Sequence, residues 1–250
     1  MSGSLAIIGL GPGRDDLITP EVSRALEQAT DVVGYIPYVE RIAARPGLTL
    51  HPSDNRVEIE RSQHALQMAT EGRDVVIVSS GDPGVFAMAA AVFETLEAGP
   101  ADWRGTEIRV LPGITAMLAA AAACGAPLGH DFCAINLSDN LKPFDLIEKR
   151  LRLAAEADFA MAFYNPRSTS RPHGFARALE ILREACGDAR PIVFARNVSR
   201  PDQAIQVMPL TEAKPEMADM RTLVILGSSQ TRVIPRDPVP IVYTPRSVSA

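Results

Sequence analysis

A glycine-rich loop near the N-terminus is the first segment that could bring backbone close to a ligand. It runs through Gly9, Gly11, Pro12 and Gly13 to Arg14-Asp15-Asp16, directly after a short apolar stretch. A dinucleotide-binding loop has a third glycine where this chain has Arg14, and two carboxylates beside a pyrophosphate would repel it. Pro12 also lacks the N–H that such a loop would donate to phosphate oxygens. The loop therefore predicts a ligand other than a dinucleotide.

Four more loops follow apolar runs and carry polar or glycine residues, at places where open α/β sheets bind ligands. They are Ser79-Ser80-Gly81-Asp82-Pro83-Gly84-Val85, Pro112-Gly113-Ile114-Thr115-Ala116, Phe163-Tyr164-Asn165-Pro166-Arg167 and Ala195-Arg196-Asn197-Val198-Ser199-Arg200. Asp82 could accept hydrogen bonds or lie near a cation, although its segment is equally good as a turn and helix cap. Five such strand ends favour one shared binding cleft over five unrelated turns.

The composition indicates a cytoplasmic enzyme. The 250 residues are 46% apolar, enough for one large or two small domains, and the net charge of −5 argues against a basic nucleic-acid-binding surface. An anionic substrate would therefore have to meet a local cluster of basic residues. Cys124, Cys133 and Cys186 are widely spaced, which favours a reducing compartment over disulfides or a metal site. No segment reads as an export signal or a membrane span.

Apolar runs alternate with helical patterns through the first half of the chain. Strands are predicted at 5–8, 31–36, 74–78 and 108–111, and helices are predicted to begin near Pro20, Val57 and Gly84. Thr19 and Pro20 together indicate a helix start, with the threonine hydroxyl as its cap. This alternation is typical of a mostly parallel α/β sheet.

Proline and glycine at 112–113 and 125–127 mark the joint between two halves, and we expect α/β domains at 1–113 and 114–250. Beyond the joint, strands are predicted at 132–137, 159–164, 192–195, 204–208 and 223–226, with long helices only at 145–157 and 175–185. Because strands outnumber helices, the second sheet is predicted to be mixed. The proline-rich tail from Ile234 is expected to lie extended on the surface or across a partner subunit.

Taken in order along nearly the whole chain, these segments resemble the tetrapyrrole methyltransferase family. The resemblance rests on the loop at 9–13 with Leu17-Ile18-Thr19 behind it, on the segments at 80–83, 112–116 and 125–131, and on the late strand at Thr222. Members of this family transfer methyl groups from S-adenosylmethionine to precorrins and related macrocycles. The resemblance implies a two-domain fold with a mostly parallel N-terminal sheet, a mixed C-terminal sheet and the active cleft between them.

The same resemblance implies S-adenosylmethionine as the cofactor, which would leave as S-adenosylhomocysteine. By similarity its contacts are Pro12, Ser80, Gly81, Asp82, Val85, Thr115, Ala116, Asn165, Asn197 and Thr222. Most of these contacts are expected from backbone groups, so the glycine loops need not bind phosphate. The main task of the protein is then to hold the methyl donor in line with a nucleophilic carbon and to exclude water, and no metal is required.

Segments of the second half are most similar to family members that methylate C17 of precorrin-3B and help to contract the macrocycle on the route to cobalamin (vitamin B12). These segments are 135–141 with Pro143, 147–151, 163–168 and 196–200. The carboxylates of the macrocycle would suit basic residues, for which the candidates are Lys142, Arg167, Arg171, Arg196 and Arg200. The candidates for the proton transfers of ring contraction are His130, Asp131, Ser138 and Asp139, since histidine titrates near neutral pH.

Other functions stay open at this point. The chain could be a sibling methyltransferase that acts at C11 or C20, or on another substrate such as the diphthamide precursor. It could instead be a nicotinamide or flavin protein, which Pro12 and Arg14 disfavour, or a carrier that binds a tetrapyrrole without catalysis. The expected partners are a second copy in a homodimer and the enzyme that makes precorrin-3B, from which the substrate would be handed over. Neither nucleic acid nor a membrane is an expected partner.

Overall fold

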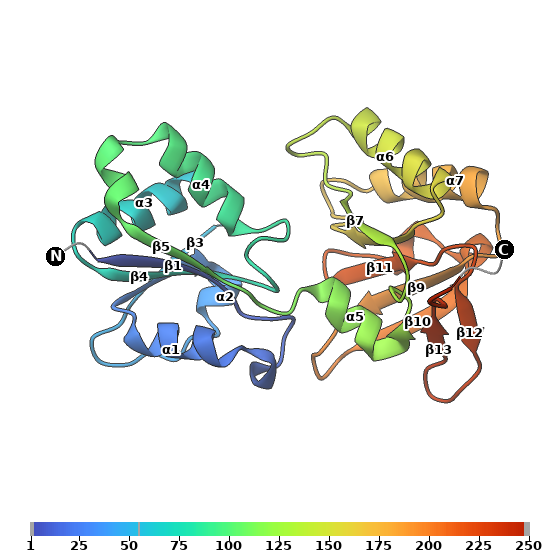
Figure 1. Cartoon of the computed structure of the whole chain (residues 1–250), viewed down its shortest axis with the longest axis horizontal. Coiled ribbons are helices and arrows are strands. Elements are labelled where there is room, and N and C mark those ends of the chain that lie inside the picture. The colour runs from blue at the N-terminus through green and yellow to red at the C-terminus, as the bar shows by residue number, and fades with distance from the viewer. Residues whose placement is uncertain (1–2, 55, 248–250) are drawn as a thin grey trace. The chain divides into compact units, whose positions relative to one another are not determined.

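The computed structural model describes residues 3–54 and 56–247. The chain divides into two units, residues 1–115 and residues 116–250, each an α/β unit with its own sheet and core (Figure 1). The boundary expected from the sequence, after residue 113, differs from this division by two residues.

The first unit is built on a five-stranded sheet in which every hydrogen-bonded pair is parallel. The order is β3-β2-β4-β1-β5, with β1 (Ser4–Gly9), β2 (Asp31–Tyr35), β3 (Thr49–Ser53), β4 (Asp74–Ser79) and β5 (Glu107–Leu111). β1 and β4 are almost continuously apolar, as expected of strands that are covered on both faces. Because all five strands are parallel, their carboxyl ends lie at a single edge of the sheet.

Helices cover both faces of this sheet (Figure 1). α3 (Glu58–Thr70) and α4 (Met88–Ala98) pack on the face that carries Leu5 and Ile7, whereas α1 (Pro20–Gln28) and α2 (Ile36–Val39) pack on the face of Ala6 and Ile8. Two short 3-10 helices, η1 (Asp15–Leu17) and η2 (Ala101–Gly105), complete the unit. The Thr19 hydroxyl accepts a hydrogen bond from the Val22 N–H at 3.3 Å, so α1 begins with the predicted cap.

The loops after β1 and β4 leave the sheet toward opposite faces. β1 is followed by α1 and β4 by α4, although the two strands are hydrogen-bonded neighbours. Adjacent parallel strands with diverging connections leave a crevice at their carboxyl ends, which is where open α/β sheets bind ligands. The two glycine-containing loops therefore lie at the part of this sheet that is best suited to a ligand.

The second unit holds a five-stranded sheet of order β10-β9-β11-β8-β7. Its strands are β7 (Phe132–Asn136), β8 (Ala160–Tyr164), β9 (Pro191–Arg196), β10 (Ala204–Pro209) and β11 (Thr222–Leu226). β7 and β8 are parallel, β11 is antiparallel to both β8 and β9, and β10 is antiparallel to β9. The mixed sheet predicted from the sequence is confirmed.

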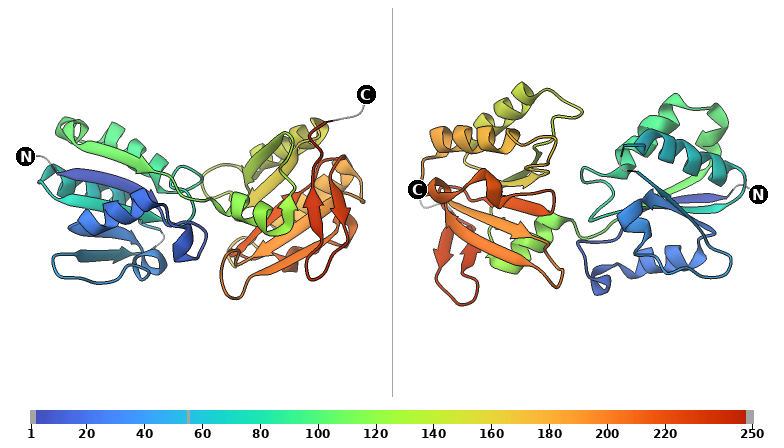
Figure 2. Two further views of the ribbon diagram at one scale, coloured as in Figure 1. Left: turned by 60° about the horizontal axis from the view of Figure 1, so that its bottom comes forward. Right: turned by 180° about the vertical axis from the view of Figure 1, so that it is seen from behind.

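α6 (Phe144–Glu156) and α7 (Gly174–Cys186) pack on one face of this sheet, against Met161, Phe163 and Phe194. Figure 2 shows the two helices on the same side of the sheet, and α5 (Ala116–Cys124) lies on the other side. The connection from β10 to β11 contains η3 (Leu210–Glu212) and η4 (Pro215–Met217). The larger side chains of the core therefore lie under α6 and α7.

Two parts of the fold differ from the sequence prediction. β3 was not predicted, because this edge strand contains Pro52 and lacks an apolar run. The tail does not simply lie extended: β12 (Arg232–Ile234) pairs with β13 (Ile241–Tyr243), which in turn pairs with β6 (Gly125–Ala126). Val242 is buried and the Thr244 hydroxyl donates to the Pro127 carbonyl at 2.6 Å. The tail is therefore part of the packing of its own unit.

Candidate functional site

Backbone hydrogen bonds join the loops after β1 and β4 at the carboxyl edge of the first sheet. The Leu10 N–H donates to the Ser79 carbonyl at 2.8 Å, the Gly11 N–H to the Gly81 carbonyl at 3.2 Å, and the Gly81 N–H back to the Gly11 carbonyl at 2.9 Å. Gly11 and Gly81 have φ angles of 65° and 64°, in the left-handed region that glycine adopts without strain. Glycine is therefore needed at both residues to close the two loops on each other.

A third loop, which follows β5, packs against the same backbone. A Cβ atom added at either Gly9 or Gly113 would collide with the Gly81 carbonyl oxygen. The loops after β1, β4 and β5 consequently meet backbone to backbone at Gly9, Gly81 and Gly113, with no room for a side chain at that point. Peptide groups rather than side chains make up the interior of this edge.

Asp82 holds two of these loops through both of its carboxylate oxygens. Oδ1 accepts a hydrogen bond from the Gly84 N–H at 2.8 Å, and Oδ2 accepts one from the Gly113 N–H at 3.1 Å. Hydrogen bonds to an ionised carboxylate are stronger than those between neutral groups. The sequence left two roles open for Asp82, ligand contact and loop support, and these bonds favour loop support.

The remaining cofactor-binding candidates of the first unit lie on the same loops or at their ends. Pro12 is buried, Ser80 and Val85 are half-buried, and Thr115 is buried at the end of the unit. Ala116, the next candidate, is the first residue of α5 in the second unit. The candidates within the first unit therefore lie on these three loops, and much of their side-chain surface is enclosed.

Polar residues of the second unit gather at one edge of its larger sheet. β7, β8 and β9 end at this edge, whereas β10 and β11 begin there, and the register pairs Asn136 with Tyr164 and Arg196 with Thr222. The predicted residues at or next to these strand ends are Ser138, Asp139, Lys142, Asn165, Arg167, Arg171, Arg196, Asn197, Arg200 and Thr222. The mixed topology thus brings together segments that lie far apart in the sequence.

Asn165 and Asn197 occupy equivalent positions, directly after β8 and β9. Their φ angles are 51° and 48°, in a left-handed conformation that asparagine tolerates better than most residues. The Asn165 Nδ2 donates to Asn136 Oδ1 at 3.1 Å, and the Nδ2 of the buried Asn197 donates to Asp202 Oδ2 at 2.6 Å. The Asn197 amide therefore closes its own turn, whereas the Asn165 amide ties its turn to the end of β7.

Arg196, Asp219 and Thr222 form a closed polar cluster at this edge. The Arg196 Nε donates to Asp219 Oδ2 at 2.9 Å, and the Thr222 hydroxyl donates to Asp219 Oδ1 at 2.8 Å. Partial burial alone would raise the pKa of Asp219, but the hydrogen bonds from Thr222 and Arg196 outweigh it and lower the pKa. The positive charge of Arg196 is therefore balanced by a carboxylate.

Lys142 and Arg171 make a second basic group that is balanced less completely. The Lys142 Nζ donates to the Ser138 carbonyl at 2.9 Å, and the Arg171 Nη1 donates to the Asn165 carbonyl at 3.3 Å. Asp139 is the carboxylate paired with Arg171, and its Oδ1 lies 4.0 Å from the Arg171 Nε. Both cations thus use carbonyl oxygens as hydrogen-bond acceptors and keep capacity for an anion.

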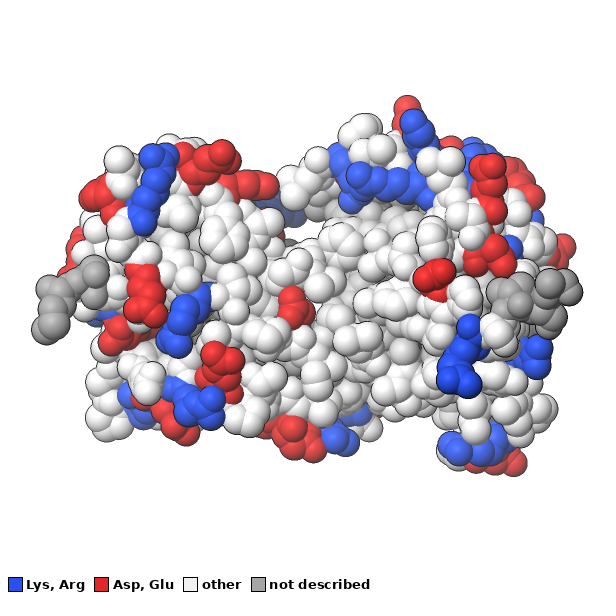
Figure 3. Space-filling model, in the orientation of Figure 1, with Lys and Arg blue, Asp and Glu red and all other residues white. Residues whose placement is uncertain are grey.

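Neighbouring charges add to this positive group. Burial, together with the charges of Arg150 and Arg171, lowers the pKa of Lys142. The Arg167 Nε is buried and has no hydrogen-bond partner among the described residues. Figure 3 shows basic side chains gathered over α6, the helix that follows Lys142. The edge of the second unit therefore suits an anionic ligand even though the chain as a whole is acidic.

The structure does not bring the four catalytic candidates together. Ser138 and Asp139 follow β7 at the polar edge, whereas His130 and Asp131 precede it. The Asp131 carbonyl accepts a hydrogen bond from the Ala160 N–H at 3.3 Å, at the opposite edge of the sheet. Seven residues of extended chain span on the order of 20 Å. Asp131 therefore cannot act at the same point as Ser138, and His130, 3.7 Å from the Asp131 carboxylate, shares that position.

Two residues that the sequence left without a role help to build these edges. Tyr164 ends β8, and its hydroxyl accepts a hydrogen bond from the Met117 N–H at 3.1 Å in the first turn of α5. Arg41 binds carbonyl groups of the loop after β1. Tyr164 belongs to the polar strand-end segment 163–167, which was predicted to contribute to a binding cleft. Nothing in the local sequence around Arg41 distinguishes it.

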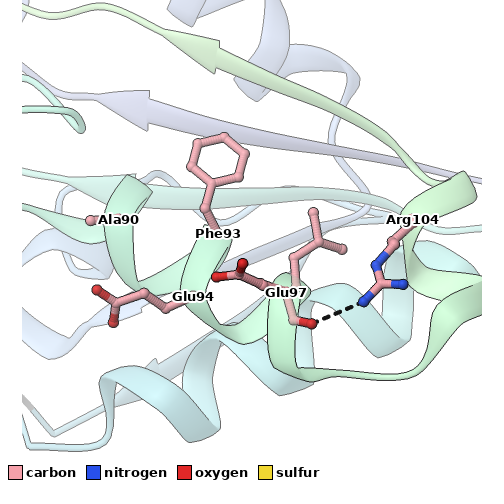
Figure 4. Close-up of a pocket in the computed structure, with 6 residues that line it drawn as sticks. Ala90, Phe93, Glu94, Glu97 and Arg104 are labelled. Atoms are coloured by element: carbon pink, nitrogen blue, oxygen red, sulfur yellow. Dashed lines mark hydrogen bonds between the residues drawn. The ribbon is translucent and has the colours of Figure 1, made fainter.

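A hollow on α4 is lined by Ala90, Phe93, Glu94, Leu96, Glu97 and Arg104 (Figure 4). The Arg104 Nη2 donates to the Glu97 carbonyl at 2.9 Å, and none of the strand-end loops contributes to the lining. Within residues 3–54 and 56–247, no group of three His, Cys, Asp or Glu side chains could hold a metal ion. Over the same residues, no helix is long and apolar enough to cross a membrane.

The comparisons with known proteins identify one family. Residues 4–214 match the family model of the Tetrapyrrole (Corrin/Porphyrin) Methylases. A Precorrin-3B C(17)-methyltransferase from Sinorhizobium sp is 53% identical over 98% of this chain and 97% of its own length. The CobIJ protein of Mycobacterium tuberculosis is 46% identical, and this chain spans about half of it, 48%.

A solved structure extends the likeness to the fold. The crystal structure of the methyltransferase CobJ is 70% identical, covers 98% of this chain and 100% of its own, and superposes with a TM-score of 0.94.

Proposed function

The chain belongs to the tetrapyrrole (corrin/porphyrin) methylases, and on that premise we propose that it transfers a methyl group from S-adenosylmethionine to C17 of precorrin-3B. The macrocycle contracts in the same process, on the route to cobalamin. The observation that carries the proposal is the match, over nearly the full length of both chains, to a relative named for that reaction. The polar edge of the second unit supports it, since a macrocycle with many carboxylates needs local positive charge.

The loops of the first unit fit a cofactor that approaches backbone. The meeting of Gly9, Gly81 and Gly113 leaves peptide groups rather than side chains at the crevice. The Ser79 hydroxyl, at the end of β4, is buried and lacks a hydrogen-bond partner among the described residues. Arg14 pairs with the neighbouring Asp16 at 2.8 Å, so a carboxylate lies beside the one basic side chain of this loop. These features suit S-adenosylmethionine, which carries no phosphate.

We assign cofactor contacts to the residues named from the sequence: Pro12, Ser80, Gly81, Asp82, Val85, Thr115, Ala116, Asn165, Asn197 and Thr222. S-adenosylmethionine supplies an activated methyl group on its sulfonium. The residues of the chain contribute binding and orientation, and exclude water from the reacting centre. For Asp82 and Asn197 the assigned contacts are those of the backbone, because their polar side-chain atoms are already bonded to neighbouring groups and hold the loops.

Lys142, Arg167 and Arg171 are our main candidates for binding the carboxylates of the macrocycle. Their charges are not fully balanced, whereas Arg196 is paired with Asp219. Ser138 and Asp139 lie beside Lys142 and are our candidates for the proton transfers of ring contraction. His130 and Asp131 are left out of this assignment, since they lie at the opposite edge. The homodimer and the cytoplasmic location expected from the sequence stay predictions.

Mass spectrometry after anaerobic incubation with methyl-labelled S-adenosylmethionine tests the proposal. We expect one labelled methyl group on precorrin-3B, together with the spectrum of a contracted ring. Label on a different precorrin, or at C11 or C20, would agree with the family but would show that C17 of precorrin-3B is not the methylated carbon. Binding of the macrocycle without any transfer of label would favour a carrier instead.

A further inference from the structure

Arg41 reaches from the segment after α2 into the glycine-rich loop of the first unit. Its Nη2 donates to the carbonyls of Leu10 at 3.2 Å and Gly13 at 3.0 Å, and it lies 3.3 Å from Asp15 Oδ1. The Arg41 side chain is 19% exposed, so the guanidinium is largely enclosed. Leu10 and Gly13 lie on either side of Gly11-Pro12, so the Arg41 side chain binds the residues at both ends of this dipeptide.

Among the described residues, the backbone hydrogen bonds of this loop hold Leu10 and Gly11 rather than Pro12 and Gly13. Gly11 is bonded to Gly81 through its N–H and carbonyl, but Pro12 has no N–H to donate and Gly13 is conformationally free. Since a peptide unit is planar, a guanidinium on the Leu10 carbonyl also fixes the direction of the Gly11 N–H. In the same way, the bond to the Gly13 carbonyl fixes the peptide unit that leads into Arg14.

The surroundings of Arg41 are not those of an ordinary surface ion pair. The Asp15 carboxyl is 88% exposed, so its attraction for Arg41 is screened by water and contributes little. The Arg41 Nη1 is buried with no hydrogen-bond partner among the described residues, which costs free energy. An unpaired buried polar group of this kind calls for an explanation, and a role in holding the loop supplies one.

We propose that Arg41 is a positioning residue for the loop that binds S-adenosylmethionine. Its guanidinium holds the carbonyls of Leu10 and Gly13, and through them it keeps the Gly11-Pro12 backbone in the shape that accepts the cofactor. The inference rests on the proposed function. Arg41 sets the affinity for the cofactor and takes no part in methyl transfer itself.

Arg45 provides a matched control four residues along the same segment. Its Nη2 also donates to backbone carbonyls, those of Leu26 at 3.0 Å, Glu27 at 2.8 Å and Ala29 at 2.6 Å. These carbonyls belong to the C-terminal end of α1, where a basic side chain stabilises a helix. The replacement of Arg45 removes a comparable set of hydrogen bonds from the same unit without touching the glycine-rich loop.

The test compares Arg41→Gln, Arg41→Lys and Arg45→Gln with the unaltered protein in two measurements. Isothermal titration gives the Kd for S-adenosylhomocysteine and for S-adenosylmethionine, and hydrogen exchange of the free protein follows the amides of residues 9–17. We expect Arg41→Gln to raise both Kd values by the same factor, about tenfold, and to speed exchange in this peptide. Arg41→Lys should fall between, because lysine keeps the charge but is shorter and lacks the planar, fixed donor geometry of the guanidinium. Arg45→Gln should lower Tm with unchanged Kd.

Each other outcome overturns a different statement. An unchanged Kd in Arg41→Gln, with Tm lowered as in Arg45→Gln, would make Arg41 a purely structural residue. Equal losses of affinity in both Gln variants would assign the effect to general destabilisation. A change of Kd for the cationic S-adenosylmethionine alone would show that Arg41 acts on affinity through its charge and not through the position of the loop. If the unaltered protein bound neither compound, the proposed function would fail, and the inference with it.

Discussion

The polar edges of the two units are made of different chemical groups. The edge of the first unit consists of peptide groups from three glycine-containing loops, closed by Asp82. The edge of the second unit consists of side chains, with asparagines in sharp turns and a group of cations around Lys142. Backbone can recognise a small ligand by shape and hydrogen bonds, whereas several carboxylates call for charge. The contrast matches a methyl donor and a polycarboxylate macrocycle.

The contrast also predicts which kind of substitution impairs each edge. An edge made of closely packed backbone is sensitive to added volume, because no side chain can move aside. An edge made of side chains is sensitive to loss of charge but tolerates changes of shape. The following substitutions test this difference.

Gly113→Ala should have the largest effect. The new Cβ would collide with the Gly81 carbonyl, which is itself held by the Gly11 N–H. We expect the free energy of unfolding to fall by about 3 kcal/mol, and binding of S-adenosylhomocysteine to be lost. Thermal unfolding and isothermal titration measure the two effects.

Gly105→Ala is the control for this substitution. Among the described residues other than its chain neighbours, none has an atom within 4 Å of a Cβ at Gly105, which belongs to η2 of the same unit. Its Tm and Kd should stay close to those of the unaltered protein. If Gly113→Ala behaved in the same way, the edge would not be as tightly packed as the backbone contacts indicate.

Asp82→Ala should weaken cofactor binding while the fold stays intact. It removes the acceptors of the Gly84 and Gly113 N–H groups, which we expect to cost about 2 kcal/mol of loop order and to raise the Kd roughly 30-fold. Asp82→Asn keeps one acceptor oxygen and should give an intermediate Kd. If both variants bound S-adenosylhomocysteine with the normal affinity, Asp82 would have no part in the site.

The sequence was sufficient for those features that depend on local pattern. Apolar runs at β1, β4 and β11 and the Thr19-Pro20 helix start were predicted, because burial and capping leave a local signal. β3, with Pro52 at an edge, and the short β12 and β13 carry no such signal, since their pairing depends on distant residues. The parallel first sheet and the mixed second one followed from the ratio of strands to helices.

In the candidate site, too, features with a local sequence signal could be predicted and those that depend on distant residues could not. The glycine loops could be located from the sequence because strained or crowded backbone requires particular residues. The pairing of Arg196 with Asp219, 23 residues away, could not be predicted, since only the register of β9 and β11 brings them together. The separation of Asp131 from Ser138 could be predicted, since a strand was expected at 132–137, and the structure has β7 between these two residues.

Lys142→Gln and Arg196→Gln compare the two kinds of cation at the second edge. Lys142 is bonded to a carbonyl and surrounded by positive charge, so its loss should raise KM for the macrocycle about fivefold with kcat unchanged. Arg196 is balanced by Asp219, so its loss should change KM less than twofold. The effect at Lys142 should shrink at high salt, where exposed charges are screened. Equal changes in KM would show that the local balance of charge does not decide substrate binding.

His130→Ala should have the smallest effect, and it separates the sequence hypothesis from the structure. The sequence made His130 one of four candidates for the proton transfers of ring contraction, and such a role predicts that contraction slows more than methylation. The structure places His130 before β7, with its Nδ1 accepting a hydrogen bond from the Asp131 N–H at 2.8 Å, while Ser138 and Asp139 follow the strand. We therefore expect both rates to change less than twofold when methylated and contracted products are followed over single turnovers. A selective loss of contraction would restore His130 to the mechanism and require chemistry at both edges of the second sheet.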